Sequence, residues 1–268
     1  HTFSFPRKQK SLFISKNFDA YTMLGGIYSD KNDKFYDPEK AELYYKWAIN
    51  QNPSRSNFVK LRLSRLYADN ESVLCDYEEA LEVLNGASDT KGSVSLQQGN
   101  IYNNSNYAGY DKKTAYECYE KAAHNGNAYG MFQKGSMLID DRNTFYNLGE
   151  GVKELEKSIQ LGKEPRYPGD TKQPEFVAAH IKLAGLYLNK NYEVYNVELA
   201  EQHLKEALGD IQHRLQKKYT RKTERDITSL ESIYLNLGKC ALEKDDPQTA
   251  KEFFTKCIQE SQSGEIRD

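Results

Sequence analysis

The sequence lacks the features that would assign it to a membrane, a metal or a catalytic class. No apolar run approaches the roughly 18 residues that a membrane-spanning helix needs. The motifs H-E-x-x-H, G-x-S-x-G, the phosphate-binding loop and G-x-G-x-x-G with its strand are missing as well. No Cys-x-x-Cys pair or metal-ligand spacing occurs among the four cysteines, Cys75, Cys118, Cys240 and Cys257. We therefore expect a non-catalytic protein with no metal site and no cofactor.

The sequence also has little excess charge of either sign. Its 37 Lys and Arg residues nearly balance 39 Asp and Glu residues, so the formal net charge is -2. Nothing draws the chain as a whole to nucleic acid or to an anionic membrane. It is instead rich in tyrosine, with 20 Tyr and 11 Phe against one Trp. Tyrosine suits half-buried positions, because its ring packs while its hydroxyl finds a polar partner.

A small residue recurs six times along the chain. Aligned on the first glycine of "LGGIY", the small residues are Gly25, Ser64, Gly99, Gly135, Ala184 and Gly238. A second pattern begins 16 positions after each small residue, or 12 positions after it in the last copy. It consists of a small residue, a large residue four positions later and another small residue seven positions later. This spacing marks one face of a helix. Each copy therefore predicts an antiparallel helix pair, and stacked pairs build a continuous core.

An acid or amide side chain follows each small residue by five positions. These residues are Asp30, Asp69, Asn104, Asp140, Asn189 and Glu243. Short polar side chains favour helix ends, because they satisfy free backbone groups. The alternative is that these six acid or amide side chains form a stripe that binds a cation or a ligand. His180, four positions before a small residue, is expected to serve packing, and His203 lies in a second-helix segment.

These residues resemble the Sel1-like repeat family, a relative of the tetratricopeptide repeat. The resemblance rests on "LGGIY" and "QGNIY", and on "KAELYYKWA" and "TAYECYEKAAHNGN" in the second helices. The sixth copy, "LGKCALEKDDPQTAKEFFTKCI", has the shorter spacing of a tetratricopeptide repeat. The resemblance implies an all-α fold, an α-solenoid of about six antiparallel helix pairs. Five pairs would be Sel1-like and the last tetratricopeptide-like, forming a right-handed superhelix.

Two insertions interrupt the repeats. The first carries Pro165, Pro168 and Pro174 and predicts a loop. The second lacks proline and predicts a helical extension, with one face formed by Arg214, Lys218, Arg221 and Arg225. The predicted organisation is an N-terminal extension (1–14), repeats 1–4 (15–161), a Pro-rich loop (162–175), repeat 5 (176–208), the basic helical insertion (209–229), repeat 6 (230–260) and a C-terminal tail (261–268).

The resemblance implies an adaptor that binds one or more proteins in a multi-protein assembly. By analogy with tetratricopeptide repeats, the residue after each small residue lies on the concave surface, which singles out Arg65, Asn100, Ser136 and Lys239. Arginine and asparagine suit carboxylates or extended backbone. The alternative is a direct binder of an acidic polymer through the basic helix. Nucleic acid is disfavoured, because Tyr219 is the only aromatic residue there.

The arrangement is similar to bacterial envelope scaffold lipoproteins of the alginate-export type. This similarity implies the periplasm or envelope, in a bacterial envelope or polysaccharide-export complex. Adaptors of ER-associated degradation are the alternative, with the cytoplasm or the ER lumen as location. Cysteine-rich members of the family bridge their paired helices. Cys257 falls on their cysteine column but Cys240 does not, so a Cys240–Cys257 bridge is disfavoured.

Overall fold

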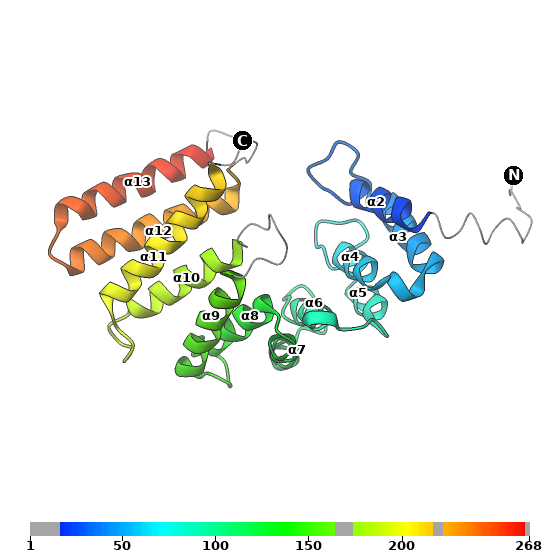
Figure 1. The fold of residues 1–268 in the computed structure, drawn as a ribbon, viewed down its shortest axis with the longest axis horizontal. Helices are drawn as coiled ribbons and strands as arrows, with labels where there is room; N and C mark the ends of the chain where they lie inside the picture. Colours follow the sequence, from blue (N-terminus) through cyan, green and yellow to red (C-terminus); the bar gives the residue numbers. More distant parts are fainter. Residues whose placement is uncertain (1–16, 164–173, 217–221, 266–268) are drawn as a thin grey trace, which may run out of the picture. The chain divides into compact units, whose positions relative to one another are not determined.

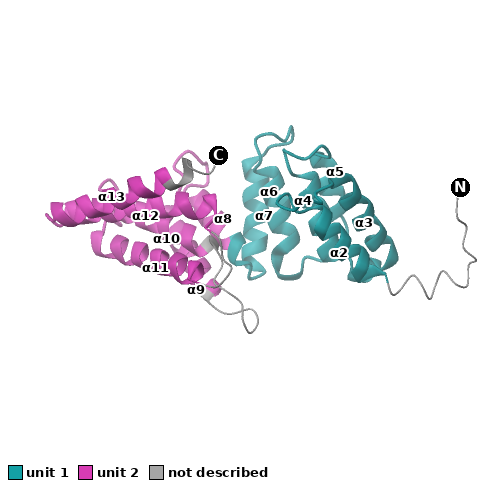
Figure 2. Ribbon diagram, turned by 90° about the horizontal axis from the view of Figure 1, so that it is seen from above, with its two compact units in different colours: residues 1–130 teal, residues 131–268 magenta. Residues whose placement is uncertain are grey.

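The computed structural model describes residues 17–163, 174–216 and 222–265. Within these ranges the regular elements are α-helices and two short 3-10 helices, η1 (Pro53–Arg55) and η2 (Thr90–Gly92), without any strand. The chain divides into two compact units, with the boundary between Gly130 and Met131 (Figure 2). We call them the first unit and the second unit.

The first unit is built from consecutive helix pairs (Figure 1). The pairs are α2 (Phe18–Tyr28) with α3 (Pro38–Gln51), α4 (Asn57–Tyr67) with α5 (Tyr77–Leu84), and α6 (Ser93–Tyr102) with α7 (Lys112–His124). Helix α3 also packs on α4, and α5 packs on α6. Each pair therefore contacts the next one along the chain, as expected for stacked repeats.

The second unit continues the same alternation. Its helices are α8 (Ala128–Leu138), which begins at the end of the first unit, α9 (Leu148–Lys163), α10 (Pro174–Tyr187), α11 (Val197–Leu215), α12 (Glu224–Glu243) and α13 (Pro247–Glu265). Helix α10 packs on both α9 and α11, and α12 packs on both α11 and α13. The predicted all-α fold of helix pairs is confirmed. The handedness of a superhelix stays a prediction, and so do the exact repeat boundaries.

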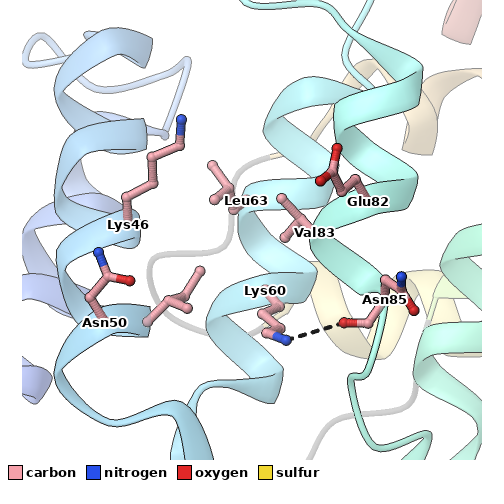
Figure 3. A pocket seen from close by; sticks show the side chains of 8 residues that line it. Lys46, Asn50, Lys60, Leu63, Glu82, Val83 and Asn85 are labelled. Carbon is pink, nitrogen blue, oxygen red and sulfur yellow. Dashed lines mark hydrogen bonds between the residues drawn. The ribbon is translucent and has the colours of Figure 1, made fainter.

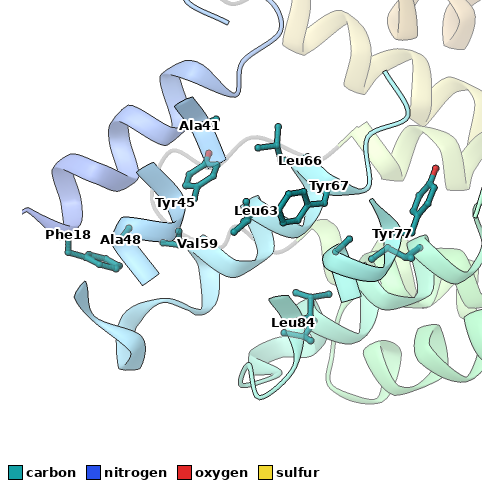
Figure 4. Close-up of a cluster of buried hydrophobic side chains, with 13 residues drawn as sticks. Phe18, Ala41, Tyr45, Ala48, Val59, Leu63, Leu66, Tyr67, Tyr77 and Leu84 are labelled. Atoms are coloured by element: carbon teal, nitrogen blue, oxygen red, sulfur yellow. The ribbon is translucent and has the colours of Figure 1, made fainter. Parts of the chain in front are cut away.

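The small residues lie where the two helices of a pair meet. A Cβ atom at Gly25 would lie 2.5 Å from the ring of Tyr45, and one at Gly99 would lie 2.6 Å from the ring of Tyr119. Both tyrosines are almost completely buried. Figure 4 shows the core built around Tyr45 by Phe18, Ala41, Ala48, Val59, Leu63, Leu66 and Tyr67. The spacing of the sequence pattern is thus a packing pattern.

One loop geometry joins the helices in the first five pairs. The side-chain oxygens of Asp30, Asp69, Asn104, Asp140 and Asn189 each accept a hydrogen bond from the backbone N–H two residues later, at 3.0 to 3.2 Å. Each loop closes when the residue before the second helix donates its N–H to the last residue of the first helix, as from Asp37 to the Tyr28 carbonyl at 2.9 Å. The prediction of helix-ending residues is confirmed for these five.

Glu243, the sixth residue of that series, behaves differently. It is the last residue of α12. Its carboxylate pairs with Lys190 at 2.7 Å and accepts a hydrogen bond from the Tyr195 hydroxyl at 2.8 Å. These contacts hold the pKa of the Glu243 carboxyl below its ordinary value, with the Lys190 hydrogen bond as the largest cause. Glu243 therefore ties the last helix pair to the loop of the preceding one.

Candidate functional site

A groove of about 510 Å³ lies in the first unit, between the loop that follows α2 and the side of α4 that carries Arg62 and Arg65. The loop after α2 forms one wall, and the exposed side of α4 forms the other. Its lining residues are Ser29, Asp30, Lys31, Asn32, Tyr45, Arg62, Arg65, Leu66 and Asp69. The groove contains Arg65, which the sequence pattern singled out, and Arg62, which it did not.

Arg62 and Arg65 are both exposed and stand three residues apart on α4. Positions with this spacing share one face of a helix. Neither guanidinium has a hydrogen bond or an ion pair within the described part of the chain. A Cβ atom at Gly26 would lie 2.9 Å from Nη1 of Arg62. The missing side chain at Gly26 therefore gives the Arg62 guanidinium room to lie against α2.

The third cation of the groove is already paired. Lys31 Nζ lies 2.7 Å from an oxygen of Asp69 and 2.6 Å from an oxygen of Glu71. Its hydrogen bonds, first to Asp69 and then to Glu71, raise the pKa of Lys31 above its ordinary value. This contact joins the loops of the first two helix pairs. Lys31 is therefore engaged within the protein, whereas the two arginines remain available to a ligand.

The floor of the groove is polar. The hydroxyl of Tyr45 lies 2.9 Å from the hydroxyl of Ser29, and the Ser29 hydroxyl donates to the Gly26 carbonyl at 3.1 Å. Tyr45 is 1% exposed, so its ring belongs to the core while its oxygen reaches the groove. Because the Ser29 proton goes to Gly26, Tyr45 donates to Ser29, and both hydroxyls of the floor are satisfied within the protein.

The other residues predicted for a concave surface are distributed over both units. Asn100, on α6, accepts a hydrogen bond from the Tyr119 hydroxyl at 3.0 Å. Ser136, on α8, is half-buried, and its hydroxyl has no hydrogen-bond partner among the described residues. Lys239, on α12, is exposed and donates to Asn236 at 3.2 Å. Only Arg65 of these four lines the groove.

The prediction of one basic helix over 209–229 is wrong. Helix α11 ends at Leu215 and α12 begins at Glu224, after the extended residue Thr223. Thr223 and Asp226 form a capping box, in which each side chain accepts the backbone N–H of the other residue. A helix start is thus built into the middle of the insertion. Arg214 and Arg225 consequently stand on two different helices rather than on one face.

The basic residues of this insertion also have acidic partners. Arg214 forms an ion pair with Asp226, which is 5% exposed, and Lys222 pairs with Glu260. Arg225 is exposed on the first turn of α12 and takes part in interactions of its own. Lys218 and Arg221 lie outside the described residues. The arginine at 214 therefore secures α11 to the start of α12, which is a structural role.

The structure brings together two histidines that the sequence analysis left apart. Nδ1 of His180 on α10 lies 2.8 Å from Nδ1 of His203 on α11. The ring of Tyr187 stacks on His203 with centroids 5.7 Å apart, and Nε2 of His180 lies 3.7 Å from a carboxylate oxygen of Glu206. The expectation that His180 serves packing agrees with its 1% exposure.

The histidine pair occupies a position that aromatic rings fill in the first helix pair. Counted from the small residue, His180, Tyr187 and His203 correspond to Tyr21, Tyr28 and Tyr44. Tyr44 stacks on both Tyr21 and Tyr28 with centroids 6.2 and 5.6 Å apart. The residues four positions before and 19 positions after the small residue are therefore neighbours in both repeats. An alignment of the repeats at these two positions predicts the contact between the histidines.

A second hollow of about 320 Å³ lies between α3, α4 and α5 (Figure 3). It is lined by Lys46, Ile49, Asn50, Lys60, Leu63, Glu82, Val83 and Asn85. Its cations are engaged locally. Lys46 pairs with Glu42 at 2.7 Å, and Lys60 donates to the Asn85 carbonyl at 3.4 Å. The groove at Arg62 and Arg65 is therefore the better candidate for recognition.

All four cysteines are free thiols, so Cys240 and Cys257 are not bridged. Burial raises the pKa of the Cys240 thiol to about 11. Among the described residues, no group of three side chains is placed to hold a metal ion. In the same part of the chain, no helix is both long enough and apolar enough to cross a bilayer.

Comparison with solved structures finds the same fold elsewhere. The Sel1 repeat protein from Oxalobacter formigenes matches with a TM-score of 0.60 and 17% identity, over 91% of this chain and 88% of that chain. A protective antigen present in uropathogenic Escherichia coli strains, which displays an SLR fold, matches with a TM-score of 0.45 and 16% identity, over 96% of this chain and 62% of that chain. No protein-family model and no curated protein matches the sequence.

The helix pairs and the first of these similarities show the class of fold. This chain has the Sel1-repeat fold, an α-solenoid fold of stacked helix pairs. The resemblance noted in "LGGIY" and its copies is therefore confirmed at the level of the fold.

Proposed function

We propose that this chain is a non-catalytic scaffold that binds other proteins within a multi-protein assembly. The observation that carries the proposal is the groove beside α4, where Arg62 and Arg65 are exposed without a partner among the described residues. Repeat folds offer extended surfaces for protein binding. Unpaired guanidinium groups on such a surface are suited to recognition, because arginine binds planar anions with two hydrogen bonds.

We propose partner contacts at Arg65 and Asn100 in the first unit and, separately, at Ser136 and Lys239 in the second unit. Arg65 is supported by its place in the groove. Asn100 is exposed and its side-chain amide can contact an extended backbone, although its oxygen already accepts from Tyr119. A bacterial envelope or polysaccharide-export complex, and an ER-associated adaptor role, are predictions from the family resemblance alone.

Site-specific photocrosslinking tests the scaffold. A photoreactive amino acid is placed at position 65 or 100, and at the exposed position 113 of α7 as the matched control. We expect the same partner protein to be captured from positions 65 and 100 but not from 113. With that partner purified, Arg65→Ala and Asn100→Ala should each weaken its binding. Capture from all three positions alike, or unchanged affinity in both variants, would refute the proposed surface.

An acidic polymer is not proposed as the ligand. That idea depended on a continuous basic helix, and the chain breaks this helix between Leu215 and Glu224. Arg214, which was expected to bind the polymer, is paired with Asp226.

A further inference from the structure

We propose that the groove beside α4 holds the carboxylate of a single Glu or Asp side chain, presented by an otherwise uncharged segment of a partner protein, between Arg62 and Arg65. This inference rests on the proposed scaffold function and names the chemistry of the partner segment. The carboxylate is recognised by two guanidinium groups from one face of α4.

The two arginines supply the attraction. Both side chains are exposed, both line the groove, and neither is neutralised by a described residue. A guanidinium presents its N–H groups as a planar fork that matches the two oxygens of a carboxylate. Two such forks, one turn apart on the same helix, can share one carboxylate.

The acidic residues of the groove limit how much negative charge it accepts. Three basic and two acidic side chains line it, and a third acid, Glu71, pairs with Lys31 from outside the lining. Lys31 is engaged with Asp69 and Glu71, and Asp30 remains as an anion beside the groove. The cations left for a ligand are Arg62 and Arg65, and one carboxylate can pair with both guanidinium groups. A phosphate, with about 1.5 to 2 negative charges at neutral pH, or a run of acidic residues would be repelled by Asp30.

Gly26 positions the Arg62 guanidinium for the ligand. Because Gly26 has no side chain, the Arg62 guanidinium lies against α2, where a methyl group would stand 2.9 Å from Nη1. The Tyr45 hydroxyl donates to Ser29 and the Ser29 hydroxyl to the Gly26 carbonyl, so the floor keeps no proton for the carboxylate and the two guanidinium groups are its donors. An apolar side chain would gain little here.

Titration with short capped peptides, followed by NMR, tests the inference on the whole chain. The probe is Ac-Gly-Glu-Gly-NH2, and the uncharged control is Ac-Gly-Gln-Gly-NH2. We expect the Glu peptide to shift the Nε–Hε signals of Arg62 and Arg65 saturably at millimolar concentration, with at least five-fold weaker binding of the Gln peptide. Arg62→Gln and Arg65→Gln should each weaken binding at least three-fold. Arg142→Gln, which removes the same charge from an exposed site in the second unit, should leave it unchanged.

Gly26→Ala is the variant that separates recognition from folding. Alanine is favoured over glycine inside a helix, so the fold should be kept while the displaced Arg62 binds the Glu peptide at least two-fold more weakly. Equal binding of the Glu and Gln peptides would overturn the proposal. So would unaltered binding in both arginine variants, or equal loss in Arg142→Gln.

Two further probes distinguish the source of the anion. Tighter binding of Ac-Gly-Gly-Gly-OH than of the Glu peptide would assign the groove to a chain terminus instead of a side chain. Tighter binding of Ac-Gly-phosphoserine-Gly-NH2 would assign it to a phosphate. Photocrosslinking at position 65 to a partner, without any response to the Glu peptide, would keep the scaffold and refute the carboxylate. A response to the Glu peptide without any crosslinked partner would keep the carboxylate site and refute the scaffold.

Discussion

A methyl group at Gly25 would collide with the buried ring of Tyr45. The new Cβ would lie 2.5 Å from two ring carbons, whereas carbon atoms in contact normally stand about 3.5 to 4 Å apart. The ring must therefore retreat by about 1 Å inside a core where Tyr45 is 1% exposed. Overpacking of this kind costs about 1–3 kcal/mol. Alanine recovers about 0.5–1 kcal/mol of helix propensity, so Gly25→Ala should destabilise the chain by up to about 2.5 kcal/mol.

Gly209 on α11 provides the matched control. A Cβ atom there would have no atom within 4 Å, so Gly209→Ala should gain helix propensity alone and stabilise the chain by about 0.5–1 kcal/mol. Urea unfolding followed by circular dichroism measures both changes in the free energy of unfolding. Adding Tyr45→Leu to Gly25→Ala should remove most of the cost of the methyl group relative to Tyr45→Leu alone. A stabilising Gly25→Ala would refute the view that the small residues are needed for helix contact.

Three further variants or reagents test other parts of the structure. Asp76→Ala removes the side chain that accepts the Glu79 N–H at 3.0 Å at the start of α5, and should cost about 1 kcal/mol of unfolding free energy in urea. Asp226→Ala strands the charge of Arg214 and removes one half of the capping box of α12, so thermal unfolding should report a loss of about 3 kcal/mol; a loss below 0.5 kcal/mol would contradict the structural role of the pair. With a thiol reagent at pH 8, the exposed Cys75 should react first. Cys240, whose pKa is raised to about 11, should stay protonated and react only as the chain unfolds or as the pH approaches that value.

The helix pairs could be predicted because packing imposes a period on the sequence. The contact of Gly25 with Tyr45 recurs as Gly99 with Tyr119 and as Gly238 with Phe254. Small and large residues at fixed spacing therefore report the fold directly. The residues that cap the second helices also recur at a fixed distance from the small residue, although the sequence pattern described above does not include them. They lie 12 positions after the small residue, as at Asp37 and Asp76, where the side chain accepts the N–H three residues later.

The break near Thr223 was also visible in the sequence. The stretch "TERD" has a threonine followed three residues later by an acid, which is the signature of a capping box. The even spacing of the basic residues predicts one helical face instead. The absence of proline is a weak argument for one continuous helix, because a helix can end and another can begin without a proline between them. The local capping chemistry of Thr223 and Asp226 overrides the charge pattern.

The groove beside α4 could be predicted only in part. Arg65 follows the repeat pattern, because it stands one position after a small residue. Arg62 was missed since its importance depends on having no partner and on its approach to Gly26, both of which are properties of three-dimensional packing. Likewise, the charge of Lys31 is cancelled by residues 38 and 40 positions away.

The loop that follows the first helix of a pair has a further consequence. Its shape is held by backbone hydrogen bonds and one Asx side chain, as at Asp30 and Asn189. Most of the neighbouring side chains face solvent, whereas Ser72 and Asn143 are buried. The same frame carries Lys-Asn-Asp-Lys in one copy and Asp-Arg-Asn-Thr in another. The chemistry displayed at the exposed positions of each loop can therefore change by substitution without moving the helices. Five such frames give this protein sites into which short recognition sequences can be grafted, one repeat at a time.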